Sequence, residues 1–285
     1  MRNILIVADS ASSFSLEEAK ELGIAILPLS VIIEKDVYQD MIGIDTEAVY
    51  EAIRAGKAVS TSQVNIGYIE EKLREWKDQY DEIIIVTLPK SLSGTYSTID
   101  LVVKQLQMEH VHVFDANNLA GIQQMVAKLF LERSKDCSFP EIAEAATAFS
   151  AHTATLIIPQ TLDQLKKGGR ISAAAAMMAT LLKIKPVLKL VNDGQTIDKY
   201  AVAKTDKKVN EIILQEIAAL QIPDQELEVY LLHADHRKRI EEVEILVKTV
   251  YPNSSIHVID LPPVLVAHAG MGCIAMQAGR KLSKL

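Results

Sequence analysis

Residues 82–96, EIIIVTLPKSLSGTY, decide how this sequence is organised. The β-branched run 83–86 predicts a fully buried strand of a parallel sheet. Pro89 ends that run, a hydroxyl-rich turn follows, and apolar residues then recur at helical spacing from Ile99 to Leu106. Such a turn lies at the carboxyl end of its strand, where open α/β sheets bind ligands. Free N–H groups at the helix N-terminus suit a carboxylate or a phosphate, although an ordinary Ser/Thr helix cap explains the same residues.

Outward from this stretch, the first half of the chain alternates strand and helix patterns. This alternation indicates a parallel sheet that is covered by helices on both faces. Residues 57–64, KAVSTSQV, predict a loop with consecutive polar side chains. The other predicted strands are 3–8, 24–33 with a bend or edge at Pro28, and 110–115, and the predicted helices begin near Ser15, Asp45, Ile66, Leu119 and Pro140.

The second half predicts a different arrangement. Asn192-Asp193-Gly194 joins two strand patterns and is a strong hairpin signal. Residues 172–182 predict an Ala/Met-rich helix, and a final helix is predicted to begin near Gly270. The predicted fold class is therefore α/β with two domains. Residues 1–155 form an N-terminal three-layer parallel-sheet domain, and residues 156–285 form a smaller C-terminal α+β domain.

Composition excludes several classes of protein. The net charge of −7 comes without a basic stripe, which argues against a nucleic-acid-binding protein. Cys137 and Cys273 are too few for a disulfide framework and predict reduced thiols in the cytoplasm. The longest mostly apolar segment, 171–182, is too short to span a bilayer, so no stable membrane insertion is expected. Neither a GxGxxG nor a GxxxxGK[ST] motif occurs, so no nucleotide cofactor is predicted.

Polar side chains gather at predicted loop or cap positions in four places. Each place has an ordinary explanation, such as a turn residue, a surface arginine or a solvated histidine. The four places are Thr61-Ser62-Gln63, Ser91-Leu92-Ser93-Gly94-Thr95, Gly168-Gly169-Arg170 and His268-Ala269-Gly270-Met271-Gly272.

In order along the chain, these blocks resemble the bacterial DegV family, which includes the fatty-acid-binding subunits of bacterial fatty acid kinases. The resemblance rests on TSQ, LSGTY after a buried strand, LKKGGRIS, LLKIKPVLKLVNDG and a late H-x-G-x-G, and it covers essentially the whole chain. It implies a lipid carrier that holds one long-chain fatty acid between two domains, needs no cofactor, has no catalytic residues of its own, and presents the carboxylate to a separate ATP-dependent kinase.

The resemblance also implies a set of ligand-binding residues. The family's carboxylate ligands fall on Thr61, Ser93 and His268, with Arg170 close to them. Ser62 and Gly94, in the same blocks, complete the predicted ligand-binding set. Pro89-Lys90 and the Ala269 and Met271 positions depart from the family pattern. For the acyl tail, residues 173–178 predict either a slot with small residues and adaptable methionines or a tightly packed core helix.

Two alternatives belong to other functional classes. Ser93 and His268 could act as nucleophile and base of an acyl hydrolase or transferase, although the motif is not GxSxG because Ser91 replaces its first glycine. A metal site could use His110 and His112, or His233 with Asp235 and His236, but the first pair alternates along a predicted strand and the second group lies at a strand end.

Overall fold

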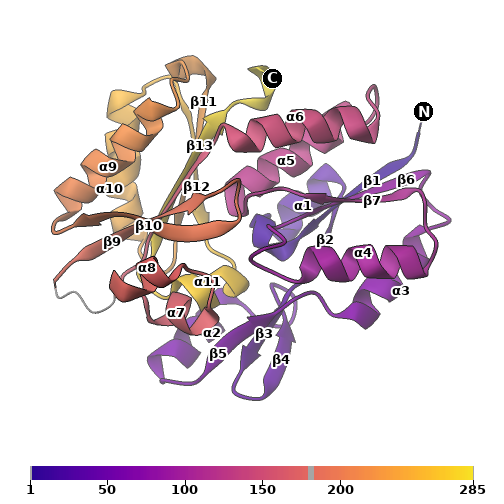
Figure 1. Cartoon of the computed structure of the whole chain (residues 1–285), viewed down its shortest axis with the longest axis horizontal. Coiled ribbons are helices and arrows are strands. Elements are labelled where there is room, and N and C mark those ends of the chain that lie inside the picture. Colours follow the sequence, from indigo (N-terminus) through magenta and orange to yellow (C-terminus); the bar gives the residue numbers. More distant parts are fainter. Residues whose placement is uncertain (1, 179–182, 285) are drawn as a thin grey trace.

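Two main β-sheets and a small third sheet form the framework of the chain, as a computed structural model shows for residues 2–178 and 183–284 (Figure 1). The first main sheet has the strand order β2-β1-β6-β7, and each neighbouring pair is parallel. The buried run 83–86 lies in its interior strand β6, as the sequence predicts. The strands are β1 (Ile4–Asp9), β2 (Ile24–Leu27), β6 (Glu82–Thr87) and β7 (Val111–Asp115).

Helices cover both faces of this parallel sheet. Helix α5 packs on β1 and β6, α6 packs on α5, α4 packs on β7 and α3 packs on α4. Figure 1 shows α5 and α6 above the sheet and α3 and α4 below it, which confirms the predicted three layers. These helices, with α1 against β2, are α1 (Leu16–Leu22), α3 (Ile66–Trp76), α4 (Thr95–Gln105), α5 (Ala120–Arg133) and α6 (Phe139–Ala151).

Helix α5 also touches the second main sheet, at β13 (Ile274–Arg280). Most of its residues are buried, on all sides of the helix, as expected for a helix between two sheets. A Cβ atom at Gly121 would lie 2.3 Å from Cγ of Tyr230, so only glycine permits this approach of α5 to the second sheet. This helix therefore couples the two halves of the chain.

The second main sheet is mixed and has six strands in the order β10-β9-β8-β13-β11-β12. Strands β9 and β10 form the predicted antiparallel hairpin, and its turn residues Asn192, Asp193 and Gly194 all have positive φ. Among the described strand pairs of this sheet, β11 and β12 alone are parallel. The strands are β8 (Ala154–Ile158), β9 (Lys185–Val191), β10 (Thr196–Ala203), β11 (Leu227–His233), β12 (Ser255–Asp260) and β13.

One sequence prediction about strands is wrong, and another is confirmed. The predicted loop 57–64 contains strand β5 (Val59–Ser62), which pairs antiparallel with β3 (Ser30–Ile33) in the small sheet β4-β3-β5. Ser60 and Ser62 are exposed on one face of this edge strand. A short run of polar residues of this kind also predicts a loop. The predicted extended segment 24–33 with a bend or edge at Pro28 is confirmed, since β2 ends just before Pro28 and β3 begins two residues after it. Strand β4 is Asp36–Gln39.

The predicted final helix near Gly270 is also wrong. A helix, α11 (Pro263–Ala269), ends at that glycine, and β13 follows as an interior strand between β8 and β11. Ala, Met and Gln favour helices, but burial on both faces of the sheet overrides that preference. The Ala-rich helix is short, α8 (Ala173–Met177), and residues 179–182 of the predicted helix lie outside the described residues.

The two faces of the mixed sheet belong to different hydrophobic cores. One face packs under α9 (Asp206–Ala219) and α10 (Arg237–Val250), in a core that contains Leu231 and Met276. The opposite face, with Leu232 and Ala275, shares a continuous core with the parallel sheet. Helix α11 contacts α2 (Thr46–Arg54), α7 (Asp163–Gly168) and β5, beside this shared core.

Candidate functional site

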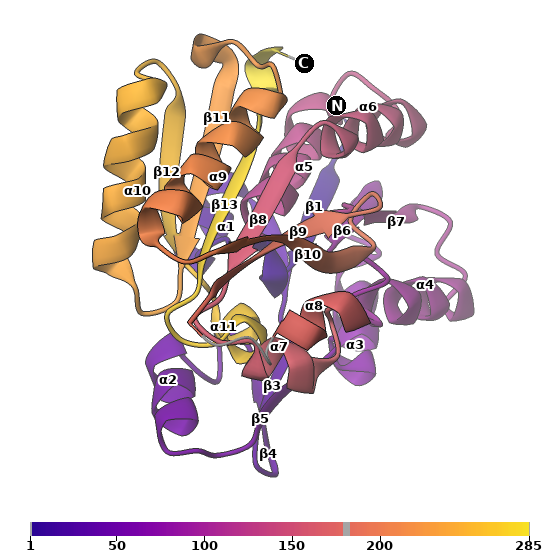
Figure 2. The same ribbon diagram turned by 60° about the vertical axis from the view of Figure 1, so that its left-hand side comes forward.

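All of the predicted site residues line one cavity of about 220 Å³. Strand β5 supplies Thr61 and Ser62, the start of α4 supplies Ser93 and Gly94, the turn after α7 supplies Arg170, and α11 supplies His268. The supporting elements β5, α7 and α11 lie together in the lower half of Figure 2, because α11 packs against both of the others. We call this space the head-group cavity.

His268 and Thr61 form the central polar contact of the head-group cavity. The distance between Thr61 Oγ1 and His268 Nε2 is 2.7 Å. Burial, with a smaller contribution from the Arg170 charge, lowers the pKa of the imidazole to about 4, so His268 is neutral at pH 7. Its Nδ1 atom has no hydrogen-bond partner among the described residues. A Cβ atom at Gly168 would lie 2.5 Å from Nδ1, so this glycine makes room for the ring.

The start of α4 forms another part of the cavity wall. Ser93 Oγ lies 2.9 Å from Thr95 Oγ1 and accepts a hydrogen bond from the Thr95 N–H group at 3.2 Å. The N-cap residue of α4 is Gly94, which makes no side-chain cap hydrogen bond, so Ser93 forms a local turn before the helix and also lines the cavity. A Cβ atom at Gly94 would lie 2.0 Å from Oε1 of Gln63, so glycine allows the Gln63 side chain to reach this place.

Arg170 is partly buried and is held by backbone carbonyls. Its Nε atom donates to the Leu92 carbonyl oxygen at 3.2 Å, and Nη1 donates to the carbonyl oxygen of Gly168. The guanidinium therefore bridges the turn before α4 and the end of α7. It contributes a positive charge to the cavity, and no carboxylate pairs with it among the described ion pairs.

A second compartment adjoins the head-group cavity and is lined mainly by apolar side chains. Its volume is about 70 Å³, and its walls include Ile157, Leu232 and Ala275 of the mixed sheet. The two spaces share lining residues, which places them in contact with each other. The shared residues are Leu119, Leu165, Ile197, Leu265 and His268. The predicted Ala/Met slot, residues 173–178, lines neither compartment, so the structure does not place the apolar wall there.

Two fully buried carboxylates hold the backbone of residues that line the cavity. Asp9 accepts hydrogen bonds from the N–H of Leu88 at 2.7 Å and from Gln123 at 3.0 Å, and Leu88 lines the head-group cavity. Asp40 accepts from the N–H of Val264, a lining residue in the first turn of α11, at 3.0 Å. Burial raises the pKa of Asp9 to about 6 and that of Asp40 to about 7.

Sequence reasoning did not assign a role to several of these residues. Gln63 stood in the TSQ block and could have been included by position alone. Asp9 ends a buried strand, but nothing local signals that its carboxylate will hold the backbone before α4. Asp40 and Gly168 act across long separations in the chain, so only the folded structure identifies them.

The two candidate metal groups are arranged for other contacts. His112 stacks on Phe139 with ring centroids 4.4 Å apart, and His233 Nε2 lies 3.2 Å from Asp260 Oδ1. Within residues 2–178 and 183–284, no group of three or more His, Cys, Asp or Glu side chains is placed to hold a metal ion. Over the same ranges, no helix is long and apolar enough to cross a membrane.

The chain is similar in sequence to DegV domain-containing proteins of several bacteria. A DegV domain-containing protein of Clostridium perfringens is 29% identical over 285 residues, covering 97% of this chain and 97% of that protein. Another, from Staphylococcus aureus, is 28% identical over 283 residues, covering 99% of this chain and 100% of that protein.

Solved structures with the same fold have been described as fatty-acid-binding proteins. "Fatty Acid Binding of a DegV family Protein from Thermus thermophilus" aligns with a TM-score of 0.89 at 25% identity over 98% of this chain and 100% of that one. The Bacillus subtilis protein DegV, a fatty acid binding protein, has a TM-score of 0.88 at 23% identity over 99% and 100%. A Eubacterium eligens family protein loaded with heptadecanoic acid has a TM-score of 0.84 at 20% identity over 98% and 100%.

The sequence profile of the DegV family, described as a family of uncharacterised proteins, matches residues 3–281. This match spans both sheets and every segment that lines the head-group cavity. The chain therefore belongs to the DegV family.

Proposed function

We propose that this protein binds one long-chain fatty acid between its two main sheets and presents the carboxylate to a separate ATP-dependent kinase. One observation supports this proposal most strongly. A polar cavity that contains hydroxyl, imidazole and guanidinium groups adjoins an apolar compartment. Fatty acids bound to solved relatives, such as heptadecanoic acid, support the choice of ligand. We further propose that the chain divides into two domains near residue 155, where β8 enters the mixed sheet.

The head group would bind through a relay of hydrogen bonds. With the proton of His268 on Nε2, the imidazole donates to Thr61 Oγ1, and the hydroxyl proton of Thr61 is free for an acceptor in the cavity. Ser93 and Ser62 add hydroxyl groups, and Arg170 offsets the negative charge. Because His268 is neutral, the carboxylate meets one permanent cation in this wall and forms no tight buried ion pair.

The acyl tail would supply most of the affinity. About 14 methylenes, at ~0.8 kcal/mol per buried CH₂, contribute roughly 11 kcal/mol before the cost of ordering the chain. Burying the carboxylate costs several kcal/mol, and hydrogen bonds from the donors of the cavity at best offset this cost. We therefore assign affinity to the tail and orientation of the carboxylate to the head-group cavity.

The hydroxyl of Ser93 is not arranged as a catalytic nucleophile. It contacts Thr95, whereas His268 uses Nε2 to contact Thr61. Nδ1 of His268 faces Gly168, and in the described structure no carboxylate orients the ring. This geometry favours a carrier over an acyl hydrolase, because nucleophilic activation requires the serine, the base and its orienting group to be linked.

The first experiment tests lipid binding directly. Native mass spectrometry of protein purified from a bacterial host should show about one fatty acid per chain, since an apolar compartment favours an apolar occupant. Ser93→Ala and His268→Ala should weaken oleate binding by about 1–3 kcal/mol, the cost of an unmade buried hydrogen bond. Ser97→Ala, on the exposed side of α4, is the matched control. An apo mass that does not change when oleate or palmitate is added would refute the carrier function.

The second experiment tests presentation to a kinase. With ATP, magnesium and oleate, acyl phosphate should form only when a DegV-associated fatty acid kinase is added, and the protein alone should not cleave p-nitrophenyl esters. Since ATP is the phosphoryl donor, we place this function in the bacterial cytoplasm. Ester cleavage that disappears in Ser93→Ala would instead establish the hydrolase.

A further inference from the structure

A separate cavity of about 300 Å³ lies at the end of the mixed sheet where α9 and α10 begin. Within the described part of the chain, it has no lining residue in common with the head-group cavity or its apolar compartment. Its walls come from the end of β8, the start of β9, the end of β10, the turn before β13 and the first turns of both helices. We call it the basic pocket.

The charge of the basic pocket is opposite to that of the whole protein. Among the described residues, its lining holds four cationic side chains, Lys183, Lys185, Lys204 and Arg239, and one carboxylate, Asp206. The complete chain has a net charge of −7. A concentration of positive charge in a concave site on an acidic protein raises the local concentration of anions.

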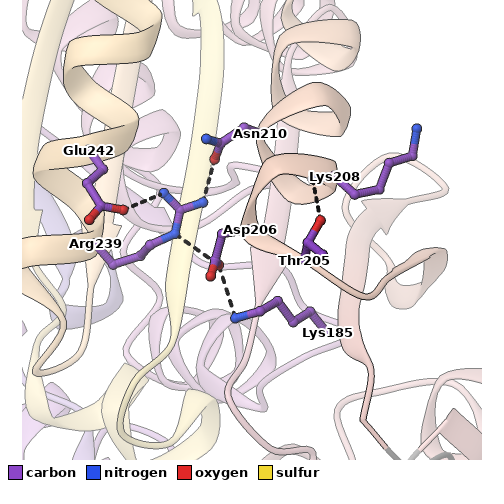
Figure 3. A network of polar contacts seen from close by, with 7 residues as sticks. All are labelled: Lys185, Thr205, Asp206, Lys208, Asn210, Arg239 and Glu242. Atoms are coloured by element: carbon purple, nitrogen blue, oxygen red, sulfur yellow. Dashed lines mark hydrogen bonds and ion pairs between the residues drawn. The ribbon is translucent and has the colours of Figure 1, made fainter.

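A network of ion pairs fixes part of this lining, as Figure 3 shows. Asp206 Oδ1 lies 3.0 Å from Lys185 Nζ and 3.2 Å from Arg239 Nε, so a single carboxylate is shared by two cations. Arg239 also contacts Glu242 at 3.5 Å and donates to Asn210. Its side chain is only 7% exposed. The guanidinium is therefore held in place before any ligand arrives.

The remaining lysines of the pocket are available to a ligand. Across residues 2–178 and 183–284, no ion pair involves Lys183 or Lys204. Both side chains line the pocket at the open end of the β9–β10 hairpin, because Lys183 precedes β9 and Lys204 follows β10. Two ammonium groups without carboxylate partners, beside a fixed guanidinium, provide charge for an anion with more than one negative charge.

Helix termini add to the positive potential. Asp206 is the first residue of α9, and Arg239 lies in the first turn of α10. Each helix has 14 residues, and the N-terminus of a helix carries a partial positive charge. A fatty acid suits this place poorly, because the lining contains mainly charged and polar residues and the ligand would carry one charge only.

We propose that the basic pocket binds the phosphoryl groups of a small molecule with two or more negative charges. The ligand is placed by Lys183 and Lys204 and by the preorganised Arg239, while Asp206 keeps Lys185 and Arg239 in position. This site is independent of the proposed fatty acid site, since its lining residues are different.

Titration calorimetry of the full chain with sodium pyrophosphate at low ionic strength tests the proposal. We expect one site per chain in the wild type and at least tenfold weaker binding in K183Q/K204Q. The matched control is K207Q/K208Q, which removes the same charge from exposed positions of α9 outside the pocket and should change the affinity less than twofold. Both variants should keep the wild-type unfolding midpoint and oleate affinity.

Three results would overturn the proposal. The first is the absence of binding heat when pyrophosphate is added to the wild type. The second is an equal loss of affinity in both double variants, which would indicate general charge attraction. The third is binding of sodium acetate as tight as that of pyrophosphate at the same ionic strength. Because oleate binding is measured on the same samples, failure of this site is distinguishable from failure of the lipid site.

Discussion

The two faces of the mixed sheet differ in how completely they are packed. Leu231 and Leu232 are neighbours on β11, and both side chains are almost fully buried. Leu231 points into the core under α9 and α10, whereas Leu232 borders the apolar compartment beside the parallel sheet. Native interiors normally have crystal-like packing density, so a retained cavity loses dispersion contacts and costs stability. The helix-covered face therefore stabilises the fold, and the opposite face leaves space for a ligand.

The largest expected effect compares these neighbours directly. Leu231→Ala should destabilise the protein by about 4 kcal/mol, towards the upper end of the range for buried Leu→Ala changes. Leu232→Ala should cost about 2 kcal/mol, the lower end of that range, because its side chain already borders open space. It should also alter the preferred acyl length. Urea unfolding and competition between fatty acids measure the two outcomes. Equal losses of stability would contradict the difference between the faces.

A smaller effect concerns the buried carboxylates on the cavity side. Burial raises the pKa of Asp40 to about 7 from 3.8, so between these values the folded state binds more protons than the unfolded state. The stability of the wild type contributed by this group is therefore present below pH 4 and is lost as pH rises through 7. In Asp40→Asn that loss should be absent, and the amide oxygen can still accept from Val264.

The stability difference between Asp40→Asn and wild type should thus grow to roughly 2–4 kcal/mol between pH 4 and pH 8. His268 has the opposite effect on stability, because its lowered pKa makes the folded state less stable as pH falls from 6.5 to about 4. Both proteins contain His268, so its contribution cancels in the difference between them. Asp36→Asn, at an exposed position of β4, is the control and should follow the wild-type curve. Parallel curves for Asp40→Asn would refute the assignment.

The smallest effect concerns the head-group cavity itself. The methyl group of Gly168→Ala would lie 2.5 Å from Nδ1 of His268 and should displace the imidazole from Thr61. We expect oleate binding to weaken about tenfold, or ~1.4 kcal/mol. Gly169→Ala is the control, since its φ of +68° makes alanine strained there but nothing lies within 4 Å of the new atom. It should reduce stability by roughly 1 kcal/mol and leave oleate affinity unchanged. Equal affinities for both variants would exclude a steric role for Gly168.

Several features were determined by the sequence alone. The β-branched run of β6, the turn and α4 follow from local patterns, and the Asn-Asp-Gly turn determines the β9–β10 hairpin. Through their resemblance to the DegV family, the ordered polar blocks also named part of the lining of the head-group cavity, namely Thr61, Ser62, Ser93, Gly94, Arg170 and His268. These signals are local, since each depends on residues within a few positions of one another.

Other features were decided only by tertiary structure. Strand β5 has a polar sequence and becomes a strand because β3 offers it a partner, and the helix-favouring residues of β13 become a strand because β8 and β11 enclose them. The contact between Gly168 and His268, the support of α11 by Asp40 and the basic pocket each join distant segments. The spacing of apolar residues in the sequence cannot predict such contacts, because they form between segments that only the complete fold brings together.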